Sequence, residues 1–259
     1  MTSVANVAPR VSARTETDRT VTDEHERYSI SFDDPAVVSE QGQGSEDGSV
    51  VGRIIQDVKL AIKAGRIVPG QRLPERDIRE LVPASRSSIR EALRRLAADG
   101  LITFEHQKGA RVRRLSRDDT REIYQSRQAL EGMAARLAAE NIGVGDYRAR
   151  LIALESEYDE IGDGTPSRYH SYNEQFHRLI VEISGNAHLA RFIEQLALPA
   201  FLTLLQVMVE PPAFELSRAE HRPIAKAILE GDGDAAEQAM RFHIARTQEH
   251  ILAKARFLN

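Results

Sequence analysis

Apolar residues recur at helical spacing between residues 85 and 99. They fall at positions i, i+3, i+4 and i+7, and the polar side chains point away from this stripe, which predicts an amphipathic helix. Ser85 is a suitable N-cap residue, and Gly100 is a suitable residue to end the helix. The apolar positions are Ile89, Ala92, Leu93 and Leu96.

Two more helices are expected before this one. The segment 50–62 carries its apolar residues on one helical face, and glycine and proline turn signals follow it. Pro74 suits the first turn of a short second helix, which Pro83 ends. A turn of about three residues then leads into the helix at 85–99, and this is the spacing of a helix-turn-helix.

The segment 101–114 predicts two short strands around a glycine-containing turn. The residues LITF and ARVRR flank the turn EHQKG, whose tip carries His106 and Lys108. A basic tip beside a helix-turn-helix is well placed to enter a DNA minor groove or to touch phosphates, whereas a hairpin with a purely stabilising role is the alternative. Together with the three helices, this hairpin predicts an N-terminal winged helix-turn-helix with a small β-hairpin wing.

The rest of the chain has only helical patterns. Ser116 with Asp118 and Asp119 makes a plausible helix start. No strand pattern or repeat of fixed period follows, so a C-terminal antiparallel bundle of six or seven helices is expected, and the fold class is mainly α. The expected helices cover residues 118–140, 146–161, 166–184, 187–208, 214–230 and 233–256.

The charge distribution divides the chain into three parts. Residues 1–48 hold 4 Lys and Arg against 10 Asp and Glu, residues 49–115 hold 15 against 7, and the remainder holds 16 against 22. A basic block of this size is the footprint of a nucleic-acid-binding module. We therefore expect a disordered acidic tail at 1–48, a DNA-binding domain at 49–115, and an effector-binding and dimerisation domain at 118–256.

Composition narrows the class of protein further. Cysteine is absent, so the chain offers neither a disulfide framework nor a thiolate metal ligand or nucleophile. No apolar run approaches the 18 or so residues of a membrane-spanning helix, and the N-terminus lacks the apolar core of a signal peptide. The sequence therefore predicts a cytoplasmic protein with no membrane partner.

Polar residues on the outer face of the helix at 85–99 suggest nucleic-acid recognition. Arginine reads guanine edges in the major groove, and serine contacts phosphates or bases. Arg86 and Arg90 lie on this face. The alternative is an ordinary solvated helix, because most surface helices have charged outer faces.

Four residues in the C-terminal part form a candidate metal site. Asn173 and His177 are four residues apart and share one helix face, and His221 and His243 lie on later helices. Three imidazoles and one oxygen ligand suit a divalent ion such as zinc, nickel or manganese. Spacing alone leaves two alternatives open: His170 is equally eligible as a ligand, and single histidines on bundle helices more often cap or pack.

The N-terminal pattern resembles the DNA-binding domain of the GntR family of bacterial transcription regulators. The carrying motifs are G-x-x-x-P-G-x-x-L, S-R-x-x-x-R-E-A-L, D-G-L-I and the glycine of the wing. One departure is Val82-Pro83-Ala84, which replaces the usual small-residue turn with glycine and leaves the operator sequence open. The resemblance implies DNA contacts from these residues: Arg76, Ser85, Arg86, Ser87, Ser88, Arg90, His106 and Gly109.

The C-terminal pattern resembles the effector-binding domain of the FadR subgroup, called FCD. The segments YQSRQALEGMAARLAAE, NEQFHRLIVEISGN and EHRPIAKAILEGDGDAAEQAMRFHI carry this resemblance. It implies a metal bound by His177, His221, His243 and the residue at 173, where the family's aspartate is asparagine. Asparagine can still ligate but brings no charge. The resemblance also implies that Arg127 faces the same cavity and pairs with a carboxylate effector, since arginine presents a planar fork of donors; a surface salt bridge is the alternative.

The sequence thus favours a regulator and not an enzyme. We expect a metabolite-responsive transcription regulator that acts as a repressor. It would bind double-stranded operator DNA as a homodimer and respond to a small organic acid. One alternative is a metal-dependent hydrolase with a DNA-binding module, although H-E-x-x-H, G-x-S-x-G and Gly-rich phosphate loops are absent. The other alternative is a DNA-binding protein that responds to no effector.

Overall fold

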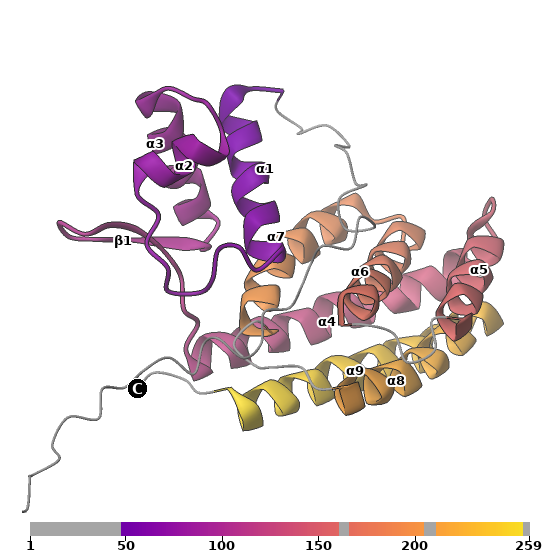
Figure 1. Cartoon of the computed structure of the whole chain (residues 1–259). Helices are drawn as coiled ribbons and strands as arrows, with labels where there is room; N and C mark the ends of the chain where they lie inside the picture. Colours follow the sequence, from indigo (N-terminus) through magenta and orange to yellow (C-terminus); the bar gives the residue numbers. More distant parts are fainter. Residues whose placement is uncertain (1–47, 161–165, 205–210, 256–259) are drawn as a thin grey trace, which may run out of the picture.

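The computed structural model describes residues 48–160, 166–204 and 211–255 (Figure 1). The expected disordered tail therefore lies, apart from Gly48, outside the described residues. Within these ranges the chain is mainly helical, with one small two-stranded sheet. None of the described helices combines the length and the apolar run that crossing a bilayer requires.

Three helices open the N-terminal part. Helix α1 (Val50–Lys63) starts where the Ser49 side chain accepts a hydrogen bond from the Gly52 N–H at 3.0 Å. Helix α2 (Glu75–Leu81) follows Pro74, as expected, and α3 (Arg86–Ala98) starts at the N-cap Ser85. Gly100 has φ 72°, a backbone conformation that glycine adopts without strain, and this ends α3.

The wing is a hairpin of β1 (Ile102–Glu105) and β2 (Gly109–Val112), which pair antiparallel. Gln107 and Gly109 have φ of 60° and 82° and form the tight connection. A bridge between Arg72 and Arg111, together with backbone hydrogen bonds such as Leu73 N–H to Ala110 O at 2.9 Å, joins the hairpin to the segment before α2. The hairpin projects from the helices in Figure 1, so that its tip is free to contact another molecule.

The hydrophobic core of the N-terminal part also takes in residues from the C-terminal part. The apolar faces of α1, α2 and α3 pack together over the base of the hairpin. Leu198 and Leu202 belong to α7 (Ala187–Leu204), yet they are buried in this same cluster. The winged helix and the bundle therefore share a core, and α7 lies beside α1 in Figure 1.

Six helices form the C-terminal bundle within the described residues: α4 (Arg117–Asn141), α5 (Tyr147–Glu160), α6 (Pro166–Ile183), α7, α8 (Pro211–Glu230) and α9 (Gly233–Lys254). Helix α4 starts at a capping box, in which the side chains of Ser116 and Asp119 each accept a hydrogen bond from the other's backbone N–H. Helices α4 and α9 run side by side (Figure 1), and Gly132 allows this close approach because a Cβ there would lie 2.7 Å from Arg241 Cγ.

The observed fold confirms the mainly α class, the winged helix-turn-helix and the helical bundle. Helix α8 begins at Pro211, three residues before the approximate start expected at 214, while the expected helix ends at 161, 208 and 256 lie outside the described residues. The prolines of the sequence EPP indicated a break between helices. Because the first turn of a helix leaves its N–H groups unused, proline is accommodated there and these prolines open the helix.

Candidate nucleic-acid interface and metal centre

The exposed face of α3 carries the arginines that the sequence singled out. Arg90 Nε lies 2.6 Å from Oε1 of Glu75, and Arg86 Nε lies 3.8 Å from Oε2 of the same carboxylate. The hydrogen bond from Arg90 is the main cause that holds the pKa of Glu75 below its usual value. Arg76 points into solvent beside Asp77. One acidic residue at the start of α2 thus aligns two arginines of α3.

The serines at the start of α3 form a small hydroxyl cluster. Ser85 Oγ lies 2.8 Å from Ser87 Oγ and 2.9 Å from Ser88 Oγ, and it also accepts a hydrogen bond from the Ser88 N–H. Ser85 therefore has a structural task as the N-cap of α3. Ser85 and Ser87 are exposed, and Ser88 is half-buried.

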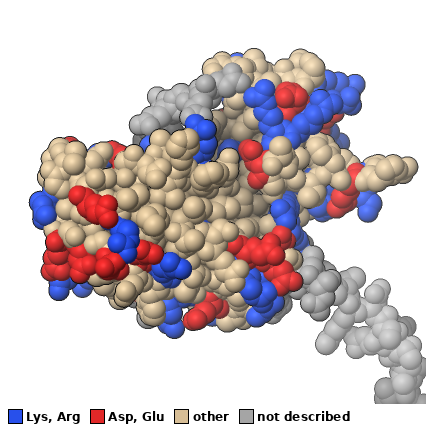
Figure 2. Space-filling model, turned by 180° about the vertical axis from the view of Figure 1, so that it is seen from behind, with Lys and Arg blue, Asp and Glu red and all other residues tan. Residues whose placement is uncertain are grey.

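The wing adds exposed groups next to this face. His106, Lys108 and Gly109 are all exposed. Lysine and arginine side chains gather over the winged-helix part of the molecule, at the upper right of Figure 2. The Val82-Pro83-Ala84 turn holds α3 in place through Val82, which is buried in the core of the winged helix.

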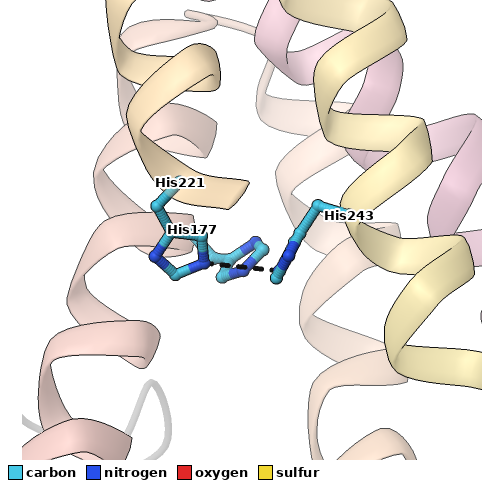
Figure 3. A group of neighbouring side chains, drawn as sticks. All are labelled: His177, His221 and His243. Carbon is cyan, nitrogen blue, oxygen red and sulfur yellow. Dashed lines mark hydrogen bonds between the residues drawn. The ribbon is translucent and has the colours of Figure 1, made fainter. Parts of the chain in front are cut away.

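Three histidines from three helices converge inside the bundle (Figure 3). His177 lies on α6, His221 on α8 and His243 on α9, and one potential ligand nitrogen from each lies within 4.8 Å of the others. Nε2 of His221 is 3.3 Å from Nε2 of His243. His221 and His243 are buried, and His177 is nearly so.

Each histidine ring is held by a different neighbour. His177 Nδ1 lies 2.6 Å from Glu131 Oε2, and His243 Nδ1 lies 3.0 Å from Glu220 Oε2. A carboxylate only accepts hydrogen bonds, so each of these two Nδ1 atoms carries a proton and donates it to its carboxylate. The His221 ring stacks on Phe176, with 4.2 Å between ring centroids.

The environment of the histidines suits a metal ion. Burial lowers the pKa of His221 well below its ordinary value, and the neighbouring histidines act in the same direction. Burial also lowers the pKa of His243, against the opposing effect of Glu220. Both rings are therefore neutral, and neutral imidazole is the form that binds metals. Nδ1 of His221 is buried without a hydrogen-bond partner among the described residues, so this ring is free to change tautomer.

The structure describes the side chain of Asn173 but not that of His170. Asn173 lies one turn before His177 on α6 and is half-buried. Its role as a fourth ligand stays a prediction. The side chain of His170 lies outside the described residues.

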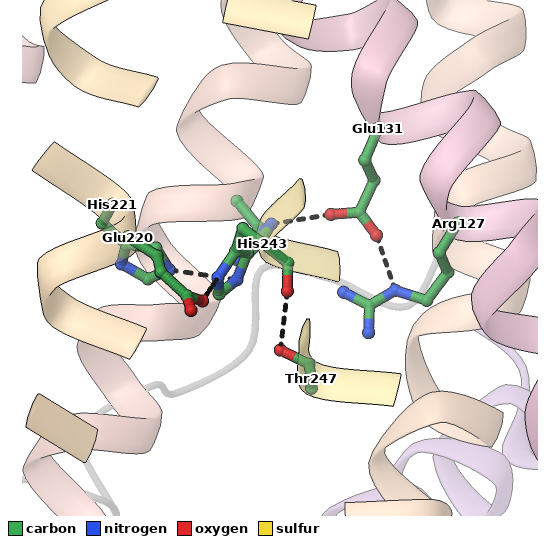
Figure 4. A network of polar contacts seen from close by, with 7 residues as sticks. Arg127, Glu131, Glu220, His221, His243 and Thr247 are labelled. Atoms are coloured by element: carbon green, nitrogen blue, oxygen red, sulfur yellow. Dashed lines mark hydrogen bonds and ion pairs between the residues drawn. The ribbon is translucent and has the colours of Figure 1, made fainter. Parts of the chain in front are cut away.

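Arg127 extends the site along α4. Its Nε lies 2.6 Å from Glu131 Oε1, while its Nη atoms point away from Glu131 (Figure 4). The side chain is 14% exposed and that of Glu131 is 3% exposed, so this ion pair is buried and is not a surface salt bridge. Burial raises the pKa of the Glu131 carboxyl, but Arg127 and His177 outweigh this effect and hold the pKa well below its usual value.

Three carboxylates of these sites were not predicted from the sequence: Glu75, Glu131 and Glu220. Glu131 follows Arg127 by four residues, so its place on the same helix face was readable from the sequence. Glu220 immediately precedes His221 but serves His243 on another helix, which only the fold reveals. Glu75 lies 15 residues before its partner Arg90, and no helical spacing joins them.

The winged helix-turn-helix with its basic face, joined to a bundle that encloses a histidine cluster, defines a DNA-binding transcription regulator. Comparison with family models agrees: residues 51–112 match the bacterial regulatory proteins of the gntR family, and residues 122–246 match the FCD domain. The chain therefore belongs to the GntR family and carries a C-terminal FCD domain, as in the FadR subgroup. This is a family of regulators and not of enzymes, so the hydrolase alternative does not hold.

Individual relatives support the same assignment. The chain is 31% identical over 201 residues to the "Probable D-xylose utilization operon transcriptional repressor" of Paenarthrobacter nicotinovorans, covering 76% of this chain and 86% of the relative. It is 30% identical over 189 residues to the HTH-type transcriptional repressor RspR of Escherichia coli K12, covering 71% and 81%. Among solved structures, E. coli McbR/YncC has the same fold, with a TM-score of 0.68 at 22% identity over 78% of this chain and 97% of that one.

Proposed function

We propose that this chain is a metabolite-responsive repressor that binds a pseudo-palindromic operator as a homodimer and is controlled by a small organic acid bound in the FCD domain. The observation that carries the proposal is the buried series Arg127–Glu131–His177, which places a cationic side chain beside three clustered histidines. A carboxylate ligand is the chemistry that such a combination favours. Two of the relatives named above are described as repressors.

Helix α3 and the wing contact the operator DNA in this proposal. Arg86 and Arg90 are exposed on one face of α3, where arginine pairs with guanine edges or phosphates. Arg76 and the hydroxyls of Ser85, Ser87 and Ser88 contribute phosphate contacts, while His106 and Gly109 bring the wing to the neighbouring minor groove. A single winged helix reads a short half-site, so pairing of two chains supplies both affinity and spacing.

The residues present fit a divalent metal ion of the zinc, nickel or manganese class. His177, His221 and His243 would hold the ion, with Asn173 as the fourth protein ligand. The bound ion would supply a positive centre that anchors the effector's carboxylate. Arg127 would bind the same ligand through its Nη groups, because Nε is already occupied by Glu131.

Contacts between the two parts of the chain support a coupling of effector binding to DNA binding. Leu198 and Leu202 of α7 are buried in the core of the winged helix. Lys63 at the end of α1 pairs with Glu174 of α6, 2.5 Å away and next to Asn173. A ligand that shifts α6 or α7 would therefore change the placement of the winged helices, which is the differential binding that allostery requires.

A gel-shift titration on the DNA upstream of the protein's own gene tests the proposal. We expect a sequence-specific complex that small organic acids weaken, with a matched scrambled duplex as control. The titration is run with metal-free protein and with protein supplied with zinc, nickel or manganese. Binding that is equally strong on the scrambled duplex, or that no acid alters in either metal state, would contradict it.

A further inference from the structure

Glu131 lies at the junction of the histidine cluster and Arg127. Its two oxygens are used by different partners: Oε2 accepts from His177 Nδ1 and Oε1 accepts from Arg127 Nε, each at 2.6 Å. The side chain is 3% exposed, so it has little freedom to exchange these partners for water. A displacement of Arg127 therefore moves the carboxylate that orients His177.

Glu131 also places a negative charge beside the candidate metal ligands. The asparagine at 173 leaves the four candidate ligands without a negative charge, although the ion would carry two positive ones. Two carboxylates contact the histidines, and they differ in setting. Glu220 is 16% exposed and lies 3.6 Å from the half-exposed Arg246, whereas Glu131 is enclosed with Arg127. Electrostatic interactions are stronger where water is excluded.

We infer that Glu131 is a positioning residue for the metal centre, which fixes the His177 ring with Nε2 toward the ion and makes metal affinity depend on the state of Arg127. The inference rests on the metal site of the proposed function and adds to it a link between the metal and the effector's arginine. Carboxylates that accept from the outer nitrogen of a ligating histidine set its tautomer and orientation, and their loss typically lowers metal affinity about 10- to 100-fold.

A double-mutant cycle with Co²⁺ as the probe tests this role. Metal-free protein is titrated with Co²⁺ against a chromophoric chelator, and the visible absorption of the bound ion is recorded. We expect Glu131→Gln to lower Co²⁺ affinity about 10- to 100-fold and to change the absorption spectrum, because the His177 ring is no longer fixed. Arg127→Lys keeps the charge but loses Nε, and should lower affinity by about threefold or more in the wild-type background.

The decisive comparison is between two backgrounds. In Glu131→Gln the Arg127→Lys change should have no further effect on Co²⁺ affinity, because lysine keeps the positive charge and the hydrogen bond that links Arg127 to His177 runs through Glu131. In Glu220→Gln, the matched control, Arg127→Lys should lower affinity by the same factor as in the wild type, because Glu220 contacts His243 and not Arg127. Additive effects in the Glu131→Gln background would overturn the inference.

Further outcomes separate this inference from the proposed function. Circular dichroism establishes that each variant is folded, and Arg127→Lys alone is the milder variant if Glu131→Gln does not fold. An unchanged Co²⁺ affinity in Arg127→Lys would overturn the link on its own. A wild-type chain that binds its operator but no Co²⁺ overturns the inference and leaves the DNA-binding role standing.

Discussion

Two arginine–glutamate ion pairs in this molecule have the same Nε–Oε1 distance, but one is exposed and the other is buried. Arg90 Nε lies 2.6 Å from Glu75 Oε1 on the exposed face of α3, and Arg127 Nε lies 2.6 Å from Glu131 Oε1 in the bundle. The Arg90 side chain is 62% exposed and that of Arg127 is 14% exposed. Equal geometry therefore has different consequences in the two regions.

Exposure determines what each pair can do. On the surface, water and salt weaken the attraction, so Arg90 can leave Glu75 for a phosphate or base at little cost. In the bundle, separation of the pair would leave Glu131 buried without the guanidinium that neutralises its charge, which is unfavourable. The first pair is suited to exchange partners, whereas the second is suited to hold a fixed geometry next to the histidines.

The largest expected effect comes from the removal of one partner of the buried pair. Arg127→Met keeps much of the side-chain volume but leaves the Glu131 charge uncompensated, and we expect a loss of about 3–5 kcal/mol in the free energy of unfolding. Urea denaturation of metal-free protein measures it. Arg90→Met is the matched control and should leave the unfolding midpoint unchanged. Similar midpoints for the two variants would contradict the distinction between the pairs.

The next effect tests whether the two regions are joined by packing. Leu202 of α7 is fully buried in the winged-helix core, so Leu202→Ala should lower the free energy of unfolding by about 2–5 kcal/mol. Exposed Phe192, on the same helix, serves as the control in Phe192→Ala. The cavity that Leu202→Ala leaves would lie between the winged helix and the bundle. The effector should therefore change operator binding less than in the wild type, and a gel shift measures this. A full response in a destabilised Leu202→Ala protein would show that coupling does not pass through α7.

The exposed pair is expected to matter for DNA binding rather than for stability. Arg90→Ala should lower affinity for the operator roughly 5- to 100-fold if Arg90 reads a base edge, with little change on a scrambled duplex. Glu75→Gln should have a smaller effect in the same direction, because Arg90 and Arg86 lose the carboxylate that aligns them. Fluorescence anisotropy over a series of salt concentrations separates the two kinds of contact. Equal losses on both duplexes, with a shallower salt dependence, would assign Arg90 to a phosphate instead.

Most helices and strands of the fold could be predicted from local sequence patterns. The helix at residues 85–99 was predicted from the spacing of its apolar residues and from Ser85 and Gly100, and α3 has these limits within a residue. Three of the four candidate metal ligands also converge as the family resemblance implied. The start of α8 was missed because proline marks both the end of one helix and the first turn of another.

Contacts between segments far apart in the chain could not be predicted from the sequence. Glu220 immediately precedes His221 but contacts His243, and Glu75 meets Arg90 only once α2 and α3 are packed. Burial was equally inaccessible: a surface ion pair was an open alternative for Arg127, and only the surrounding helices exclude water from it. Such properties depend on which helix faces meet, and spacing within one helix does not encode this.

The smallest expected effect belongs to the exposed pair that joins α1 to α6. Lys63 Nζ and Glu174 Oε1 are 2.5 Å apart, but both side chains are largely exposed, and such a pair contributes at most about 1 kcal/mol. Lys63→Gln should therefore change the unfolding midpoint little and shift the effector response by less than about fivefold at physiological salt, with a larger shift at low salt. A shift that does not depend on salt would show that α1 and α6 communicate through packing and not through this charge pair, so that Leu202 and its neighbours on α7 would carry the coupling.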